Sequence, residues 1–322
     1  MDIVDMAIAR IQQASKMSLL LYEQPLVITI SGGKDSSVIL DLAGKAGIPY
    51  EVQHSHTTAD APETVRFVRS EFARLESTGI KCICSMPVYK GERTSMWSLI
   101  PQTRIAPTRS TRYCCAVLKE QNCADRYIVT GVRWAESARR KASRAPHEIQ
   151  HRDKAKTVLM LSMDSDEDRR TFETCQLKGK RICNPIVDWS DDDVWDYLQA
   201  ERVSVNPLYA EGWQRVGCVG CPMAGKLRYK EFARWPKYKT MYLHAFDRML
   251  KAREAAGMNN QGVWGGHCRW RVALVDGGRC TAWTDDDVWG GRSAMMHLGD
   301  IAKVSELYLK EMDRWGYGKA SG

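Results

Sequence analysis

The sequence predicts an α/β fold, in which an open, mostly parallel, twisted sheet carries helices on both faces and is followed by a helical C-terminal extension. Short apolar segments alternate with helical segments along the first half of the chain, which is typical of parallel strands joined by crossover helices. The first apolar segment runs directly into a glycine-rich turn and then into a helix. After residue 226 the apolar periodicity is helical.

The elements are expected in a regular order. Apolar residues at helical spacing predict a helix over residues 3–22, and the apolar segment 26–30 predicts a buried parallel strand. The elements expected after it are a helix at 36–45, a strand at 50–54, a helix at 62–75, strands at 80–84 and 127–130, helical residues at 227–256 and a short helix near 299–314. Residues 135–180 are polar and basic with little periodicity, so we expect a long excursion over the functional site.

The composition is that of a globular protein, with 44% hydrophobic and 27% charged residues. No stretch approaches the roughly 18 apolar residues of a membrane span, and the N-terminus has no secretory pattern. We therefore expect a cytoplasmic protein without a membrane partner. The net charge of +8 suits a polyanionic partner. The 11 cysteines are not expected to form disulfides in a reducing compartment, which leaves metal binding or packing.

One internal repeat is present. Residues 189–195, Trp-Ser-Asp-Asp-Asp-Val-Trp, recur at 283–289 with Thr in place of Ser. Ser190 or Thr284 would cap a helix, and the aspartates would lie in its first turn, where the helix dipole favours negative charge. Metal binding by the aspartates is the alternative, although three consecutive residues do not share one helix face.

A phosphate-binding loop is predicted between the first strand and the next helix. Its residues are Ser31, Gly32, Gly33, Lys34, Asp35, Ser36 and Ser37. Glycines let the backbone approach an anion, and free N–H groups at a helix start point at phosphate oxygens. Lys34 adds positive charge, whereas Asp35 would cap the helix or bind Mg²⁺. The spacing fits neither the Walker loop nor the dinucleotide fingerprint, and an ordinary glycine turn is the alternative.

This loop resembles the PP-loop of the ATP pyrophosphatases and sulfonucleotide reductases, the superfamily of the PAPS reductases. The resemblance implies that the loop holds the phosphates of ATP with Mg²⁺, or of an adenylyl-sulfate. It also implies catalytic roles for Lys34 and Asp35. Residues 56–64 are similar to the segment after the superfamily's second strand, but residues 58–60 read Thr-Ala-Asp where the superfamily usually has Asp-Thr-Gly.

A second segment carries the same resemblance. Residues 131–139 look like the superfamily's Gly-x-Arg-x-x-Glu-Ser segment. The resemblance implies that Gly131 and Arg133 contact the nucleotide, and that Arg133 and Arg139 act on the substrate's anionic groups. A solvated basic face is the alternative for Arg139. Together with the loop, this predicts a PP-loop nucleotide-binding domain over residues 1–226 and a mostly helical, Trp- and Gly-rich region over residues 227–322.

Two cysteine pairs form a candidate metal centre. Cys114 and Cys115 are adjacent, and Cys218 and Cys221 form a Cys-x-x-Cys. Four thiolates suit zinc or an iron–sulfur cluster, and a redox disulfide is an alternative for the second pair. The pattern resembles the bacterial adenylyl-sulfate reductases, which implies that the four cysteines hold a [4Fe–4S] cluster.

A related branch is similar at the second pair. Residues 217–222, Gly-Cys-Val-Gly-Cys-Pro, resemble the DNA phosphorothioation sulfur-transfer proteins, whereas the nucleophilic Glu-Cys-Gly-x-His-type motif of the assimilatory reductases is not found. The resemblance implies activation of a DNA or RNA site with ATP, and sulfur from a cysteine desulfurase or another donor. Basic and aromatic residues interleave over 226–239 and would suit a nucleic acid. The alternative is an amphipathic helix whose aromatic residues pack inward.

The sequence thus predicts an iron–sulfur enzyme of the ATP pyrophosphatase type that activates a nucleic-acid or nucleotide acceptor for sulfur insertion. The first alternative is an assimilatory sulfonucleotide reductase that produces sulfite. The second is a non-catalytic nucleic-acid-binding protein on the same scaffold.

Overall fold

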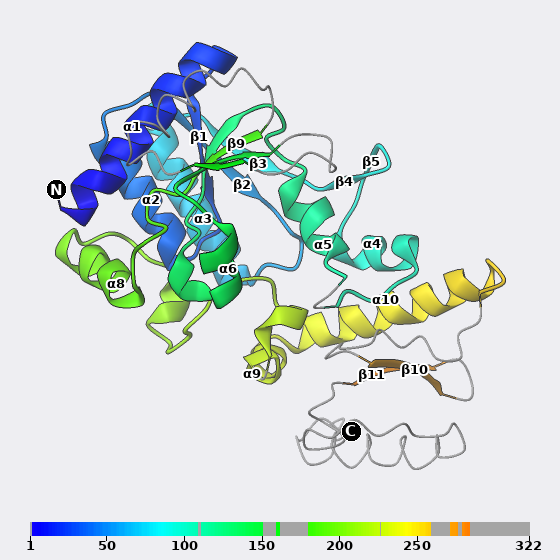
Figure 1. The fold of residues 1–322 in the computed structure, drawn as a ribbon. Helices are drawn as coiled ribbons and strands as arrows, with labels where there is room; N and C mark the ends of the chain where they lie inside the picture. The colour runs from blue at the N-terminus through cyan, green and yellow to red at the C-terminus, as the bar shows by residue number, and fades with distance from the viewer. Residues whose placement is uncertain are drawn as a thin grey trace. The chain divides into compact units, whose positions relative to one another are not determined.

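Within the described residues, seven strands form one sheet, of which five consecutive neighbours run parallel (Figure 1). The computed structural model describes residues 2–108, 111–150, 159–161, 180–225, 227–258, 271–275 and 279–283. The strand order is β3-β2-β1-β6-β9-β7-β8, and β7 pairs antiparallel with both β9 and β8. The strands are β1 (Leu26–Ile30), β2 (Tyr50–Ser55), β3 (Cys82–Ser85), β6 (Tyr127–Val129), β7 (His147–Gln150), β8 (Leu159–Leu161) and β9 (Lys180–Cys183). The predicted α/β fold with a mostly parallel sheet is confirmed.

Helices join the parallel strands, as the sequence predicts. They are α1 (Ile3–Tyr22), α2 (Lys34–Lys45), α3 (Pro62–Glu76), α5 (Tyr113–Cys115), the π-helix η1 (Ala116–Glu120), the 3-10 helix η2 (Trp134–Glu136), α6 (Ala138–Ser143), α8 (Asp191–Ala200) and the 3-10 helix η3 (Pro207–Tyr209). The expected helices at 3–22 and 62–75 agree with α1 and α3, and Pro62 stands in the first turn of α3. Helix α2 begins at Lys34, two residues earlier than expected, so the loop lysine belongs to the helix's first turn.

The strand β1 shows how the core forms on the faces of the sheet. Successive side chains of a strand point to opposite faces. Leu26, Ile28 and Ile30 join the large apolar cluster, which also contains the buried residues of α1, α2 and α8. Val27 instead packs with Ile128 and Ile182 of the neighbouring strands. Both faces of β1 are therefore buried, as its nearly continuous apolar sequence predicts.

The expected excursion over residues 135–180 is wrong in part. This segment contains α6, β7 and β8 and begins β9 at Lys180. Its strands β7 and β9 are hard to recognise because charged residues are buried in them beside the apolar ones. Glu148 of β7 is fully buried and pairs with Arg144, and Arg181 of β9 is also fully buried. Polar side chains paired inside the fold hide the apolar pattern by which strands are found in sequences.

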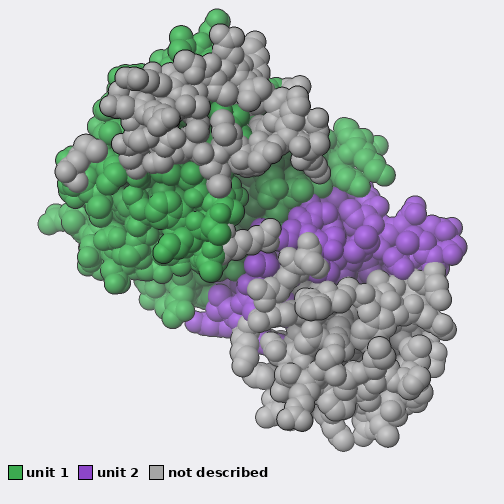
Figure 2. Space-filling model, viewed as in Figure 1, with its two compact units in different colours: residues 1–94, 115–218 green, residues 95–114, 219–322 purple. Residues whose placement is uncertain are grey.

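The chain divides into two compact units, drawn in green and purple in Figure 2. Unit 1 comprises Met1–Thr94 and Cys115–Cys218, and unit 2 comprises Ser95–Cys114 and Val219–Gly322. Unit 1 contains the whole sheet, and also the short pair β4 (Val88–Tyr89) and β5 (Glu92–Arg93). The expected domain boundary at residue 226 stays a prediction.

Unit 2 is built around a long helix. Its helices are α4 (Met96–Thr103), the 3-10 helix η4 (Pro222–Ala224), α9 (Leu227–Arg234) and α10 (Pro236–Glu254), and its strands are β10 (Arg271–Val275) and β11 (Arg279–Trp283). The ring of Trp97 packs edge-on against Tyr242 with 4.9 Å between centroids. Phe232 and Trp235 are each only 9% exposed, and Arg228 is buried. Phe232 and Trp235 of segment 226–239 therefore pack inward, whereas Tyr229 is 37% exposed. The helical C-terminal extension is confirmed over α9 and α10.

The first copy of the repeat is a helix start, as predicted. The Ser190 side chain accepts a hydrogen bond from the backbone of Asp193, and the Asp193 side chain accepts one from the backbone of Ser190, which forms a capping box at the start of α8. In the second copy, residues 284–289 lie outside the described residues, as does the helix expected near 299–314. None of the helices in the described part of the chain is long and apolar enough to cross a membrane.

Candidate phosphate site in unit 1

The glycine turn after β1 is held in a conformation that only glycine allows. Gly32 has φ of +77°, and a Cβ atom there would lie 2.8 Å from Thr64 Cγ2. Gly33 is the N-cap of α2 and has no side-chain cap. The hydroxyl of Ser36 donates to the Gly33 carbonyl over 2.7 Å. The backbone N–H groups at the start of α2 are therefore presented at the carboxyl end of a buried strand, where anions bind.

Two cations lie buried beside this turn. Lys34 is 7% exposed and Arg133 is 2% exposed. Arg133 Nε donates to Asp35 Oδ1 over 2.6 Å, and Arg133 Nη2 donates to Asp191 Oδ1 over 2.7 Å. Lys34 Nζ also reaches both carboxylates, over 3.2 Å to Asp35 Oδ1 and 2.7 Å to Asp191 Oδ1. We call residues 31–37 together with Arg133 and Asp191 the cradle.

The pKa shifts of Arg133 and Asp191 favour the charged forms of these two groups. Burial would lower the pKa of Arg133, but the carboxylates of Asp35 and Asp191 outweigh it and raise that pKa. Hydrogen bonds from Lys34 and Arg133 lower the pKa of Asp191. Two cations and two carboxylates thus stand together. The expectation that Asp35 caps α2 is not met, because Asp35 pairs with Arg133 and Lys34 instead.

Gly131 brings the strand β6 close to the loop. A Cβ atom at Gly131 would lie 3.0 Å from the backbone carbon and carbonyl oxygen of Asp35. β6 pairs with β1 in parallel, so the residues after these two strands meet at one edge of the sheet. The structure therefore brings Gly131 and Arg133 to the loop. Arg139 lies on α6, and its side chain is outside the described atoms.

Three residues of the site were not predicted as site residues. Asp191 was interpreted only as part of a helix start. Asn206 Nδ2 donates to the Gly32 carbonyl and to Thr64 Oγ1, each over 3.1 Å. The hydroxyl of Tyr209 accepts the backbone N–H of Lys34 over 2.9 Å. Burial raises the pKa of this hydroxyl to about 12. Residues 206–209, Asn-Pro-Leu-Tyr, are separated by eight residues from the second cysteine pair, and their position there was the available signal.

Cys218 lies at the same edge of the sheet. Its backbone forms an antiparallel bridge with Asp60, and its thiol lies 3.4 Å from Thr57 Oγ1. Thr57 and Asp60 follow β2, which is the neighbour of β1. Burial would raise the pKa of Asp60, but a hydrogen bond from His56 and the charge of Lys119 lower it to about 2.

The four predicted cysteine ligands are divided between the units. Cys115 and Cys218 belong to unit 1, and Cys114 and Cys221 belong to unit 2. Cys114 is buried, and Cys115, Cys218 and Cys221 are half-buried. Among the residues that the structure describes, no group of three or more His, Cys, Asp or Glu side chains is placed to hold a metal ion. The four-cysteine centre stays a prediction.

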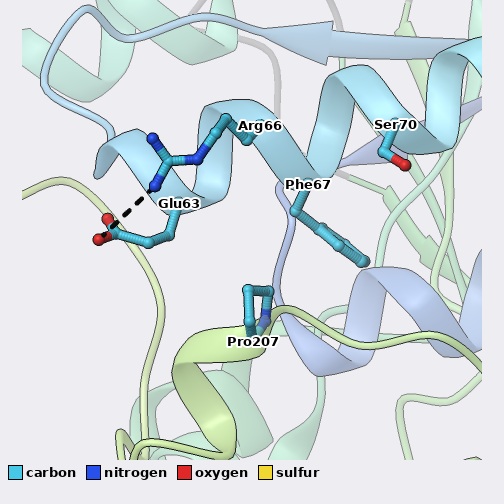
Figure 3. Close-up of a pocket in the computed structure, with 5 residues that line it drawn as sticks. All are labelled: Glu63, Arg66, Phe67, Ser70 and Pro207. Carbon is cyan, nitrogen blue, oxygen red and sulfur yellow. Dashed lines mark ion pairs between the residues drawn. The ribbon is translucent and has the colours of Figure 1, made fainter.

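A separate hollow of about 280 Å³ lies between α3 and η3 (Figure 3). Its lining residues are Glu63, Arg66, Phe67, Ser70 and Pro207. Glu63 and Arg66 form a loose ion pair over 3.9 Å. The residues of α3 that lie beside Gly32 are Thr64 and Val68, and neither of them lines this hollow.

Comparison with known proteins relates most of the chain to one family. The profile of the phosphoadenosine phosphosulfate reductase domain matches residues 25–224. An uncharacterised protein of Methanocaldococcus jannaschii is 26% identical over 252 residues, which are 76% of this chain and 51% of that protein. The chain spans about half the length of this relative and of a second one from the same organism. The adenosine 5'-phosphosulfate reductase of Staphylococcus saprophyticus is 21% identical over 208 residues, covering 63% of this chain and 73% of the reductase.

Solved structures give weaker likenesses. The phosphate complex of the phosphoadenylyl-sulfate reductase of Candida auris has a TM-score of 0.39 at 18% identity, covering 64% of this chain and 87% of that one. The FMN adenylyltransferase of Candida glabrata with ATP has a TM-score of 0.40 at 14% identity, covering 67% and 60%.

Proposed function

This chain belongs to the phosphoadenosine phosphosulfate reductase family, and we propose that its cradle binds the phosphates of an adenine nucleotide for sulfur chemistry. The observation that carries the proposal is the pair of buried cations, Lys34 and Arg133, beside the glycine turn that follows β1. Buried cations beside the N-terminus of a helix favour a polyanionic ligand.

The leading reaction is of the ATP pyrophosphatase type. An oxygen of the acceptor attacks the α-phosphorus of ATP, the bond from that phosphorus to the bridging oxygen breaks, and pyrophosphate leaves with the electron pair. The acceptor is then adenylylated, and a sulfur nucleophile replaces adenylate at the activated carbon or phosphorus of the acceptor. These two steps are redox-neutral provided that the donor supplies sulfur at the sulfide level.

Each predicted site residue has a role in this proposal. Lys34, Arg133 and Arg139 stabilise the negative charge that develops on the phosphates. Ser31, Gly32, Gly33, Ser36, Ser37 and Gly131 hold the phosphates and keep the backbone close. Asp35 orients Arg133 and, with Mg²⁺ bound to ATP, balances charge in the loop.

The donor set of the four cysteines fits an iron–sulfur cluster. Cys114, Cys115, Cys218 and Cys221 offer four sulfur ligands, and soft thiolates suit iron. A [4Fe–4S] cluster bound by them would supply inorganic sulfide and redox-active iron. In unit 1, Cys218 lies at the carboxyl edge of the sheet, on the same side as the cradle. That position supports sulfur chemistry near the nucleotide.

The acceptor and the donor are proposed by class. The acceptor is a DNA or RNA site or a nucleotide, and the donor is a cysteine desulfurase or another protein that carries labile sulfur. A desulfurase carries its sulfur as a persulfide, so a dithiol reductant must supply two electrons to release that sulfur at the sulfide level. The net charge of +8 supports a polyanionic acceptor.

The experiment uses anaerobically purified full-length chain. We expect it to bind ATP·Mg²⁺ and to catalyse exchange of labelled pyrophosphate into ATP when DNA or RNA is present. Lys34→Met should abolish both. Lys45→Met is the matched control, because Lys45 lies on the same helix but pairs with Asp41 and Glu201. Equal loss in both variants, or absence of nucleotide binding in the wild type, would contradict the proposal.

A sulfonucleotide reductase is the second candidate, and the match to the S. saprophyticus reductase favours it. The chain would be incubated with labelled adenylyl-sulfate, thioredoxin and a reductant. Sulfite release, without any exchange of pyrophosphate into ATP, would establish the reductase and exclude the transferase.

The cluster has its own test. Iron and acid-labile sulfide would be measured in anaerobic wild type, in Cys218→Ser and in Cys84→Ser. Cys84 is an exposed free thiol and serves as the control. We expect about four irons in the wild type and the control, as a cubane cluster requires, and loss in Cys218→Ser. Zinc in place of iron would refute the cluster.

A further inference from the structure

Two carboxylate oxygens bridge the same two buried cations. Asp35 Oδ1 lies 3.2 Å from Lys34 Nζ and 2.6 Å from Arg133 Nε. Asp191 Oδ1 lies 2.7 Å from Lys34 Nζ and 2.7 Å from Arg133 Nη2. The four formal charges cancel, so the cradle is neutral without a ligand.

The two carboxylates differ in how they are held. The Asp35 side chain is 25% exposed and lies next to Lys34 on α2. The Asp191 side chain is 67% exposed and comes from the first turn of α8. Both cations are nearly buried, with side chains 9% and 2% exposed. Asp191 is therefore the solvent-side partner of a buried cation pair.

We propose that Asp191 is an exchangeable counter-ion, whose Oδ1 occupies in the free protein the position that a phosphoryl or sulfuryl oxygen takes when the nucleotide binds. The inference rests on the proposed function, since it concerns the same cradle. Asp191 is thus a specificity-determining residue, because every anionic ligand must compete with it for Lys34 and Arg133.

The geometry suits this exchange. One oxygen of Asp191 accepts hydrogen bonds from both cations, which a single terminal oxygen of a phosphoryl group can also do. The remainder of the ligand would extend toward solvent, on the side where Asp191 is exposed. A diphosphate or triphosphate carries more charge than one carboxylate and displaces it, whereas a singly charged ligand gains little. Asp191 therefore biases the cradle toward multiply charged phosphates.

Helix α8 does not need this carboxylate. Its first turn is capped by Ser190 and Asp193, which hydrogen-bond each other's backbone. Asp192 remains beside them in the first turn, where acidic residues complement the helix dipole. Asp191→Asn should therefore keep α8 while removing the competing charge. Asp192→Asn makes the same change of charge on an exposed neighbour and is the matched control.

The test is calorimetric titration of the full chain with inorganic pyrophosphate at low ionic strength. We expect Asp191→Asn to bind pyrophosphate about tenfold more tightly than the wild type, the range of one charge-assisted pair. The affinity of Asp192→Asn for pyrophosphate should stay within about twofold of the wild-type affinity. A residue that merely positioned Lys34 and Arg133 would give the opposite sign, since its removal would weaken binding.

Equal or weaker binding by Asp191→Asn overturns the inference. If that variant fails to fold, Asp191→Ser is titrated instead and carries the same expectation. ATP and adenylyl-sulfate are titrated in parallel. Tighter pyrophosphate binding in Asp191→Asn, with neither nucleotide bound by any variant, would reject the proposed function and leave the counter-ion role standing.

Discussion

Asn206 holds the glycine turn from 174 positions away along the chain, because its side-chain amide donates to the Gly32 carbonyl over 3.1 Å. The same amide nitrogen donates to Thr64 Oγ1 on α3. Asn206 is fully buried. The conformation of the loop is thus fixed by η3 and α3 as well as by its own glycines.

Asn206→Ala should lower the free energy of unfolding and weaken nucleotide binding by the glycine loop. The substitution leaves the buried carbonyl of Gly32 without this donor, which costs about 1–3 kcal/mol. Urea unfolding gives the change in the free energy of unfolding, and nucleotide titration gives the effect on the loop. An unchanged free energy of unfolding would show that Asn206 contributes no net stability.

Gly32→Ala should lower the free energy of unfolding more than Gly79→Ala does. Both Gly32 and Gly79 have positive φ, of +77° and +84°, but a Cβ atom at Gly79 meets nothing within 4 Å. We expect Gly79→Ala to cost about 1 kcal/mol from backbone strain alone. Gly32→Ala adds the 2.8 Å clash with Thr64 and should cost at least about 1 kcal/mol more and impair nucleotide binding. Equal free energies of unfolding in the two variants would contradict the clash.

Arg133→Lys should weaken both stability and ligand binding. The guanidinium donates to Asp35, to Asp191 and to the carbonyl of Trp189 at once, which one ammonium group cannot reproduce. We expect a loss of about 2 kcal/mol in stability and about tenfold or more in nucleotide affinity. Arg140→Lys is the control, since Arg140 pairs with Glu136 on an exposed surface and should change stability by less than about 1 kcal/mol. Similar losses in both variants would refute a special role for Arg133.

His147 should make stability depend on pH. Its ring is fully buried, and burial together with the charges of Arg10 and Arg181 lowers its pKa to about 3. The unfolded chain takes up the proton near pH 6.5, whereas the folded protein does not. Stability from this residue is therefore present above about pH 6.5 and is lost as the pH falls toward 3.

The measurement compares wild type with His147→Asn by urea unfolding between pH 7 and pH 4. The difference in free energy of unfolding should fall by up to about 1.4 kcal/mol per pH unit below pH 6. Parallel curves for the two proteins would show that His147 titrates equally in both states.

The strands β1, β2 and β6 and the loop after β1 were predictable, because each has a local signature. A continuous apolar segment ended by glycines identifies β1 and its turn. The strands β7 and β9 were not predictable from apolar periodicity. Glu148 is buried beside Arg144 and the side-chain amide of Asn184, and Arg181 is buried in the neighbouring strand. A single-sequence pattern does not show that such charged residues lie inside the fold.

The same distinction holds for the site. Lys34 and Asp35 belong to a contiguous motif, and Arg133 to a second one, so they were found. Asp191 was recognised only as an acidic residue of a helix start. Its contact with Lys34 depends on the packing of α8 near α2, 157 positions apart in the chain. The local sequence correctly predicts helix α8, but it does not predict which residues the Asp191 side chain contacts.

The close approach of Gly131 to the backbone of Asp35 limits how the sequence can vary. A Cβ atom there requires the Asp35 backbone to move by a few tenths of an ångström, whatever torsion angles residue 131 itself adopts. In a library randomised at position 131 and selected for function, glycine should therefore be enriched over every larger residue. Position 79, by contrast, should accept asparagine, because its only demand is on its own torsion angles.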